Sequence, residues 1–363
     1  MLSNSEIQRY NCHIVMPEVG ISGQEKIKKS RILMIGAGGL GCPVLQYLTA
    51  VGVGTIGIVD YDRVYERNLH RQILYDRNDI GKYKTDVAVK KLSQLNPFVK
   101  FNIYTHKLTN VNATKTLEDY DVVIDGSDNF STRFLVNDTC VMLNKPLVFG
   151  AIYKFCGQVS VFNYKNGPTY RCLFPEQPDD DDSPDCASAG VIGILPGIIG
   201  TIQANETLKI ILEKGEVLSG RLLQFDTLNF NMEIINFSRG ADTHSTSPSN
   251  LEDTDINTVS FQELKHMQEK QEDILIYDLR EQDQFKSYNL GGKCISAEEL
   301  MNTPDLIPKD KKVIILCEFG VKSNAVVEYL QRVEQMPNVF NLSGGIHNTF
   351  NHNRNNLYGR DFR

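Results

Sequence analysis

Residues 31–41 read RILMIGAGGLG, an apolar run that leads directly into a glycine-rich turn. The run predicts a buried strand, and the apolar spacing of residues 40–51 predicts a helix after the turn. Glycines in such a turn let the backbone approach phosphate groups, and the start of the helix offers free N–H groups to negative charge. The segment therefore predicts a nucleotide site. The glycines expected to bind the nucleotide are Gly36, Gly38, Gly39 and Gly41.

The rest of the N-terminal region repeats this alternation of strand and helix. Strands are expected at 31–35, 55–59, 101–104 and 121–124, and helices at 40–51, 84–95 and 130–143. Strands separated by such helices favour parallel pairing. We therefore predict an α/β fold with a doubly wound, Rossmann-like and mostly parallel sheet, which binds ligands at the carboxyl ends of its strands.

The composition changes sharply at one place in the chain. Residues 238–257 lose apolar periodicity and become rich in Ser, Thr, Asp and Asn, which is typical of a flexible linker. We expect a first domain at 1–238, a linker at 239–257 and a second domain at 258–363. A further polar stretch at 175–185 contains four adjacent aspartates, which repel one another, so it is expected to be a loop within the first domain.

Bulk properties exclude several classes of protein. A net charge of −7 argues against a protein that coats nucleic acid. The polar N-terminus lacks the apolar core of a signal peptide, which favours a cytoplasmic protein. The longest apolar stretch, 191–202, is interrupted by glycine and proline and is shorter than the roughly 20 residues of a membrane span, so no membrane contact is expected. The eight cysteines include no CxxC pair, as in a reducing compartment.

Charged residues after the glycine turn indicate which nucleotide binds. Asp60 ends the second predicted strand, where a carboxylate accepts hydrogen bonds from ribose hydroxyls, and up to this point an NAD-dependent dehydrogenase explains the pattern. A group of residues rich in cations and amides then follows. Its members are Asp62, Arg67, Asn68, Leu69, His70, Arg71, Gln72 and Lys84. A triphosphate under nucleophilic attack needs such cations to neutralise departing pyrophosphate, whereas a dinucleotide does not.

Asp128 and Asn129 follow the strand expected at 121–124 and would lie at the same edge of the sheet. A carboxylate at that edge can hold Mg²⁺ against the phosphates. The N-terminal domain is therefore predicted to bind ATP and Mg²⁺.

Longer motifs in the first domain resemble the MoeB/ThiF family of adenylyltransferases, relatives of the ubiquitin-activating enzymes. They are GAGGLGCP at 36–43, RNLHRQ at 67–72, GKYK at 81–84, DGSDNFSTR at 125–133 and CASAGVIGILPGIIGTIQANETLK at 186–209. The resemblance implies a reaction in which the C-terminal glycine of a ubiquitin-like sulfur carrier attacks the α-phosphate of ATP. The products are an acyl adenylate and pyrophosphate.

The resemblance also implies roles for individual residues. Gly39 and Asp60 would contact the nucleotide, Asn68 and Arg71 its phosphates, Lys84 the α-phosphate region and Asp128 the Mg²⁺, while Cys186 would form a covalent link to the carrier. Two positions depart from the family pattern. Cys172 is the one remaining ligand of a four-cysteine zinc site, so no structural zinc is predicted. Cys12 stands where relatives carry an arginine that crosses a homodimer interface to the triphosphate.

A cysteine loop characterises the second domain. Strands expected at 274–277 and 313–316 are followed by CEFGVKS at 317–323 and by a helix at 324–332. Cys317 at a strand end, within a loop that wraps onto a helix N-terminus, lies under converging N–H dipoles that stabilise a thiolate or persulfide. A phosphatase uses a similar loop, but such loops generally end in arginine, where this chain has Lys322.

With DLRE at 278–281 and NLSGGI at 341–346, the second domain resembles a rhodanese, a smaller α/β domain that carries persulfide sulfur. The segment NLGGK at 289–293 departs from the family pattern. The joint hypothesis is adenylation of a carrier ending in Gly-Gly, then thiocarboxylate formation with sulfur from a donor such as a cysteine desulfurase. The alternatives are a non-catalytic carrier-binding module and an NAD-dependent dehydrogenase. The motifs do not distinguish molybdopterin, thiamine and tRNA thiolation pathways.

Overall fold

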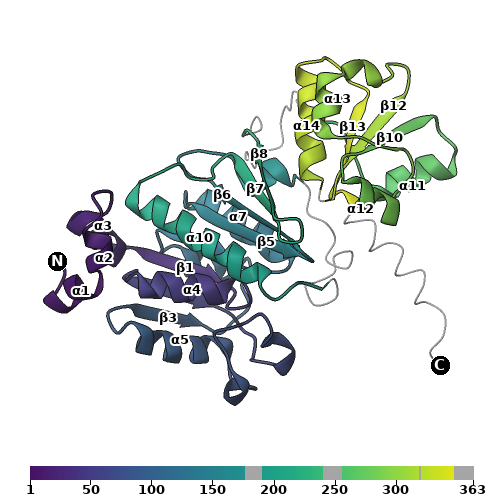
Figure 1. Cartoon of the computed structure of the whole chain (residues 1–363). Helices are drawn as coiled ribbons and strands as arrows, with labels where there is room; N and C mark the ends of the chain where they lie inside the picture. Colours follow the sequence, from purple (N-terminus) through teal and green to yellow (C-terminus); the bar gives the residue numbers. More distant parts are fainter. Residues whose placement is uncertain (176–189, 240–255, 319, 347–363) are drawn as a thin grey trace, which may run out of the picture. The chain divides into compact units, whose positions relative to one another are not determined.

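The computed structural model describes residues 1–175, 190–239, 256–318 and 320–346 (Figure 1). The chain forms two compact units. One comprises Met1–Tyr170 and Pro184–Arg239, and the other comprises the remaining residues, most of them in Gly240–Arg363. Cys186 and the 175–185 loop beyond residue 175 lie outside the described residues.

The first unit is built on an eight-stranded sheet with the order β3-β2-β1-β4-β5-β6-β7-β8. The strands are β1 (Arg31–Ile35), β2 (Thr55–Val59), β3 (Lys100–Tyr104), β4 (Val122–Asp125), β5 (Leu147–Tyr153), β6 (Cys156–Phe162), β7 (Arg221–Asp226) and β8 (Asn231–Asn236). The strands β3, β2, β1, β4 and β5 pair in parallel, while β6, β7 and β8 are antiparallel. The predicted doubly wound, mostly parallel sheet is confirmed.

Helices precede the first strand of this sheet and connect its strands, and some of them pack against it. They are α1 (Asn4–Arg9), α2 (Asn11–Ile14), α3 (Gly20–Lys29), α4 (Gly41–Ala50), α5 (Lys84–Leu95), α6 (Ala113–Leu117), α7 (Phe130–Met142), α8 (Tyr170–Leu173) and α10 (Leu195–Leu212), with the short 3-10 helices η1 (Glu66–Asn68) and η2 (Arg77–Asp79). The long α10 packs against α4, β5 and β6 (Figure 1). Its burial on several sides holds the start of α10 close to the glycine turn, where Pro196 meets Gly39.

The glycine turn after β1 depends on the absence of side chains. Gly36 has φ +87°, and a Cβ there would lie 3.0 Å from the carbonyl oxygen of Gly126. A Cβ on Gly41, the first residue of α4, would lie 2.1 Å from the carbonyl oxygen of Gly36. The turn therefore folds back on the start of its own helix, and Gly41 permits that close approach.

Replacing Gly41 by alanine is expected to destabilise the first unit by about 1–3 kcal/mol, because the added methyl group forces the turn and helix apart. Gly197 is the matched control, since it lies in α10 with nothing within 4 Å of a Cβ. Gly197→Ala should be neutral or stabilising through helix propensity. Urea unfolding followed by circular dichroism measures both variants. Equal stability of Gly41→Ala and the unsubstituted protein would contradict this packing argument.

The second unit is a smaller five-stranded sheet with the order β11-β10-β12-β13-β9, and every pairing in it is parallel. The strands are β9 (Thr258–Val259), β10 (Ile274–Asp278), β11 (Lys293–Cys294), β12 (Lys312–Leu316) and β13 (Val339–Leu342). The helices are α11 (Phe261–Glu269), α12 (Gln282–Ser287), α13 (Ala297–Asn302) and α14 (Val321–Arg332), with the 3-10 helix η4 (Pro304–Leu306). The predicted second α/β domain is confirmed, and the expected strands at 274–277 and 313–316 are β10 and the central strand β12, which pair with each other.

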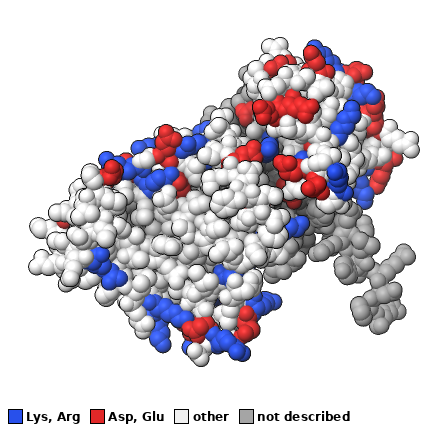
Figure 2. Space-filling model, viewed as in Figure 1, with Lys and Arg blue, Asp and Glu red and all other residues white. Residues whose placement is uncertain are grey.

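Surface composition is mixed on the face shown in Figure 2. Basic and acidic side chains are interspersed there, and a broad area of the first unit carries neither. Within the described part of the chain, no helix has the length and apolar character needed to cross a membrane.

Candidate active site

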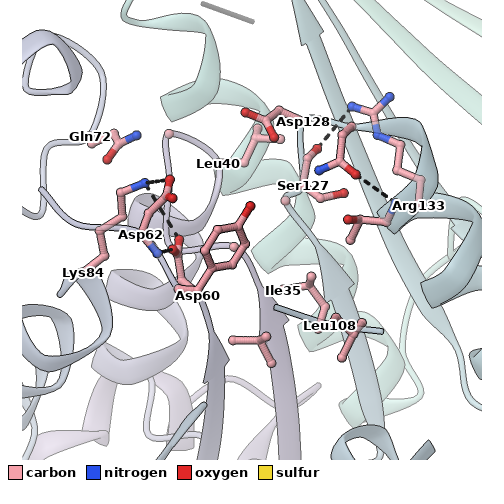
Figure 3. A pocket seen from close by; sticks show the side chains of 18 of the residues that line it. Ile35, Leu40, Asp60, Asp62, Gln72, Lys84, Leu108, Ser127, Asp128 and Arg133 are labelled. Carbon is pink, nitrogen blue, oxygen red and sulfur yellow. Dashed lines mark hydrogen bonds and ion pairs between the residues drawn. The ribbon is translucent and has the colours of Figure 1, made fainter. Parts of the chain in front are cut away.

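A pocket lies at the carboxyl ends of β1, β2 and β4, beside the glycine turn (Figure 3). Parallel strands present such a site because their carboxyl ends meet at one edge. The expected nucleotide residues that line this pocket are Gly36, Gly38, Gly39, Asp60, Asp62, Arg71, Gln72, Lys84, Asp128 and Asn129. Residues from separate parts of the sequence are thus brought together around one cavity.

Asp60, at the end of β2, holds the glycine turn in shape. Its Oδ2 accepts the backbone N–H of Ala37 at 2.8 Å, and its Oδ1 accepts the N–H of Asp62 at 2.8 Å. Burial raises the pKa of the Asp60 carboxyl, and attraction to Lys84 opposes that rise. Tyr75 adds a second tie, since its hydroxyl donates to the carbonyl of Ala37 at 2.8 Å. The turn is therefore fixed before any ligand binds.

Lys84 is a buried cation at the wall of the pocket. It is the first residue of α5, and its side chain is only 4% exposed. Its Nζ lies 2.9 Å from Oδ2 of Asp62 and 4.0 Å from Oδ2 of Asp60 (Figure 3). A buried ammonium group needs such counter-ions. Since the Asp62 side chain is half exposed, an incoming phosphate can replace it as a partner of Lys84.

Arg71 and Gln72 follow η1 and face the glycine turn. Arg71 Cγ would lie 3.7 Å from a Cβ on Gly39, and Arg71 Nη1 is 2.8 Å from Nε2 of His70. Gln72 is 4% exposed, and within the described residues its Oε1 has no hydrogen-bond partner. An unsatisfied amide at a pocket wall fits a polar ligand, because leaving it unpaired costs free energy.

Asp128 lies across the pocket from Lys84, in the loop between β4 and α7 (Figure 3). Its side chain is exposed, and no hydrogen bond or ion pair of its carboxylate occurs among the described residues. Those residues also include no group of three or more His, Cys, Asp or Glu placed to hold a metal. Magnesium that arrives with a nucleotide needs only one or two protein carboxylates besides the phosphates, so Asp128 fits that ion.

Other expected residues lie outside the pocket lining. Gly41 packs beneath the turn, and Arg67 lies over the ring of Tyr65 with 5.5 Å between its Cζ and the ring centroid. Asn68 is buried, and Leu69 packs against the hydrophobic core. His70 reaches the site only through Arg71. These side chains shape the segment that presents Arg71 and Gln72.

The pocket also contains residues that the sequence analysis did not single out. They are Ile35, Leu40, Val59, Tyr61, Lys107, Leu108, Gly126, Ser127, Thr132, Arg133 and Ile152. Two features of the sequence could have indicated some of these residues. Ser127, Thr132 and Arg133 belong to the DGSDNFSTR motif, and Lys107 follows the end of β3, a strand whose carboxyl end lies beside that of β2.

The cysteine loop of the second unit begins directly after β12. Cys317 is 5% exposed, and its Sγ lies 3.4 Å from the backbone nitrogen and 3.3 Å from the hydroxyl oxygen of Ser323. The backbone N–H of Ser323 can donate to the sulfur, whereas the single hydroxyl hydrogen of Ser323 also has Oδ1 of Asn341 as an acceptor at 2.7 Å. Gly320 has φ +78°, and a Cβ there would lie 2.8 Å from the backbone nitrogen of Gly344. The loop thus closes around the sulfur in a way that requires glycine.

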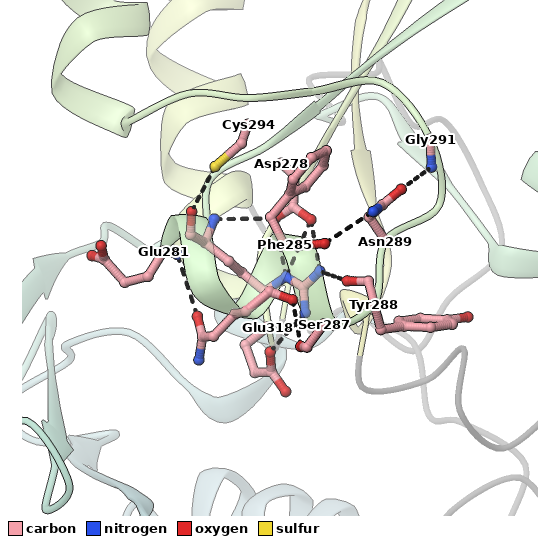
Figure 4. A network of polar contacts seen from close by, with 11 residues as sticks. Asp278, Glu281, Phe285, Ser287, Tyr288, Asn289, Gly291, Cys294 and Glu318 are labelled. Atoms are coloured by element: carbon pink, nitrogen blue, oxygen red, sulfur yellow. Dashed lines mark hydrogen bonds and ion pairs between the residues drawn. The ribbon is translucent and has the colours of Figure 1, made fainter.

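The buried guanidinium of Arg280 contacts Glu318, the residue after Cys317 (Figure 4). Arg280 Nη2 lies 2.8 Å from Oδ2 of Asp278, and Arg280 Nη1 lies 3.4 Å from Oε2 of Glu318. Nη2 also donates to the carbonyl of Tyr288 at 2.7 Å. The carbonyl of Arg280 accepts from the thiol of Cys294 at 3.1 Å. This network ties the cysteine loop to the end of β10.

The fold and the two sites define a class: a nucleotide-binding α/β protein with an attached cysteine-loop domain. The ThiF family model matches residues 10–246, and the rhodanese-like domain model matches residues 260–351. The chain therefore belongs to the ThiF family and carries a rhodanese-like domain.

Relatives agree with this assignment. The chain is 51% identical over 231 residues to the sulfur carrier protein adenylyltransferase of Thermus thermophilus, which covers 62% of this chain and 85% of that protein. It is 34% identical over 370 residues to the probable adenylyltransferase/sulfurtransferase MoeZ of Mycobacterium tuberculosis, which covers 95% and 93%. The crystal structure of E. coli MccB with ATP aligns with a TM-score of 0.56 at 20% identity, covering 66% and 73%, and supports the fold alone. The chain is thus an enzyme of the adenylyltransferase class with a sulfurtransferase-type domain.

Proposed function

We propose that this enzyme adenylates the C-terminal glycine of a ubiquitin-like sulfur carrier ending in Gly-Gly, using ATP and Mg²⁺. We propose further that a persulfide on Cys317 then supplies the sulfur of a carrier thiocarboxylate. The observation that carries the proposal is the arrangement of Lys84, Arg71 and Asp128 around one glycine turn. Two cations and a carboxylate at this turn suit a triphosphate that loses pyrophosphate better than they suit a redox dinucleotide.

In the first step, a carboxylate oxygen of the carrier attacks the α-phosphorus of ATP. The bond from that phosphorus to the oxygen bridging the β-phosphate breaks, and pyrophosphate leaves with the bonding electrons. Lys84 and Arg71 would stabilise the negative charge that develops on the phosphates. Asp128 would hold Mg²⁺, which supplies further charge neutralisation. Most of the catalysis would come from positioning, because the fixed glycine turn orients the nucleotide before attack.

In the second step, the terminal sulfur of the Cys317 persulfide attacks the acyl carbon, and AMP leaves. A thiol must then cleave the resulting S–S bond to release the thiocarboxylate. The hydrogen bond from the backbone N–H of Ser323 to the sulfur supports Cys317 as the carrier of a charged sulfur species. Cys186 remains our prediction for a covalent link to the carrier.

Pyrophosphate exchange tests the adenylation step. The purified enzyme should exchange labelled pyrophosphate into ATP when a cognate Gly-Gly carrier is present, and the same carrier without its last glycine should not support exchange. No exchange with any Gly-Gly carrier, together with tight binding of NAD, would contradict the proposal and favour the dehydrogenase alternative.

We also propose that the enzyme acts as a cytoplasmic homodimer that receives sulfur from a donor such as a cysteine desulfurase. Exposed apolar side chains near the N-terminus, Val15 at 67%, Met16 at 42% and Ile21 at 56%, support a partner surface there. Light scattering after gel filtration should give twice the mass of one chain.

A further inference from the structure

A buried amide links α10 to the strand that precedes Asp128. Gln203 lies in α10 with no exposed surface, and its Nε2 donates to the carbonyl of Asp125 at 2.7 Å. The same nitrogen lies 3.4 Å from the carbonyl of Val148 in β5. A Cβ on Gly150 would lie 2.5 Å from Cδ of Gln203, so the absence of a side chain there makes room for the amide. Burying an amide costs free energy, which the bonds of Nε2 offset only in part, because Oε1 of Gln203 has no hydrogen-bond partner among the described residues.

Asp125, the residue whose carbonyl Gln203 binds, is the last residue of β4 and leads into the loop at the pocket. Its side chain has no exposed surface, and its Oδ1 accepts the backbone N–H of Ser127 at 2.9 Å. Burial raises the pKa of the Asp125 carboxyl, against the attraction of Arg133. The next residue, Gly126, donates its N–H to the carbonyl of Ile35 in β1 at 2.9 Å. The backbone from 125 to 127 is therefore fixed.

The other side of Asp128 is also held. Arg133 Nη2 donates to the carbonyl of Ser127 at 3.2 Å. Asn129 caps α7, because its Oδ1 accepts the N–H of Thr132 at 2.9 Å. Asp125 Oδ1, the Ser127 carbonyl and Asn129 Oδ1 on either side of Asp128 are thus used in bonds, whereas the Asp128 carboxylate has no such bond within the described part of the chain.

We infer that Gln203 and Asp125 are positioning residues, which hold the β4–α7 loop so that the Asp128 carboxylate meets the magnesium of the nucleotide. This inference rests on the proposed function, in which Asp128 binds that ion. A ligand fixed by its surroundings binds a metal more tightly than a mobile one, because less conformational entropy is lost on binding.

Gln203→Met tests the inference, with Gln24→Met as a matched control. Gln24 is also a glutamine without exposed surface whose Nε2 donates to a backbone carbonyl, that of Val51 at 2.8 Å, but it does not line the pocket. Mn²⁺ binding to the enzyme with a non-hydrolysable ATP analogue is measured by electron paramagnetic resonance, without any carrier. Gln203→Met should weaken Mn²⁺ binding about tenfold or more, as losses around a metal ligand generally do. Gln24→Met should leave it within about twofold, and both should lose similar thermal stability.

Equal Mn²⁺ affinity in the two variants would overturn the inference, as would an unsubstituted enzyme whose bound nucleotide takes up no Mn²⁺. Asp125→Asn is a second variant for the case in which Gln203→Met does not fold. It keeps an oxygen for the N–H of Ser127, so positioning predicts Mn²⁺ affinity within about threefold of the unsubstituted enzyme. A larger loss of Mn²⁺ affinity in Asp125→Asn would show that the negative charge of Asp125 matters. That result would reject a positioning role. Normal Mn²⁺ binding without carrier-dependent exchange would refute carrier adenylation, while magnesium binding by Asp128, the part of the proposed function on which this inference rests, would stand.

Discussion

Substituting Lys84 by alanine is expected to lower carrier-dependent ATP–pyrophosphate exchange by on the order of 10²–10³-fold, the usual effect of removing one group that stabilises transition-state charge. The Nζ of Lys84 is buried at the pocket wall and paired with Asp62 at 2.9 Å. Phosphates that displace Asp62 would meet a cation with little competing solvent, so its electrostatic effect would be large. The effect should fall on kcat as well as on KM for ATP, because charge on the leaving pyrophosphate grows during the reaction.

Lys91→Ala is the control for Lys84→Ala. Lys91 lies in the same helix, α5, and forms ion pairs of 2.6 Å with Asp76 and Asp79, but it does not line the pocket. Its loss should leave exchange within about twofold, because none of the three side chains in these ion pairs lines the pocket. Melting temperatures of both variants separate unfolding from loss of catalysis. Normal function of a folded Lys84→Ala enzyme in cells would support the non-catalytic carrier-binding alternative.

The parallel half of the first sheet could be predicted because its strands are short, mostly apolar runs in the sequence. The run from Ile32 to Ile35 is apolar throughout, and its residues are at most 3% exposed. Charged residues precede the run, and glycines follow it. The strand expected at 101–104 begins one residue later than β3, and the strand expected at 121–124 is shifted by one residue relative to β4.

The helix α10 shows why the remainder of the first unit was harder to predict. Residues 191–202 contain Gly193, Pro196, Gly197 and Gly200, which in sequence read as interruptions. In the structure, Gly200 permits close contact, since a Cβ there would lie 2.6 Å from the carbonyl oxygen of Leu40. A helix packed on more than one side has no amphipathic period, so periodicity does not reveal it.

Motifs predicted the composition of the site better than its geometry. Neighbours in RNLHRQ at 67–72 point in different directions because the chain turns through η1 there. Arg71 and Gln72 therefore line the pocket, while Asn68 and Leu69 do not. The ion pair of Lys84 with Asp62 could not be predicted from the sequence, because the two residues are 22 positions apart and the fold brings them together. Gln203 was missed for the same reason, since its contact with Asp125 spans 78 positions.

Substituting Cys317 by serine is expected to abolish thiocarboxylate formation while leaving pyrophosphate exchange within about twofold, because a serine hydroxyl cannot carry a persulfide. The serine oxygen is smaller than sulfur, yet it can still accept from the backbone N–H of Ser323, whose nitrogen now lies 3.4 Å from Sγ, so the loop should keep its shape.

Cys294→Ser is the matched control for Cys317→Ser, because Cys294 lies in the same unit and donates its thiol to the carbonyl of Arg280, a bond that a serine hydroxyl can replace. Mass spectrometry of the carrier after incubation with enzyme, ATP and a sulfur source detects the replacement of an oxygen by sulfur. Only the control should form that product. Equal thiocarboxylate yields from the two variants would remove Cys317 from the mechanism and leave the adenylation site to act with an external sulfur nucleophile, because the acyl adenylate is reactive enough to accept one.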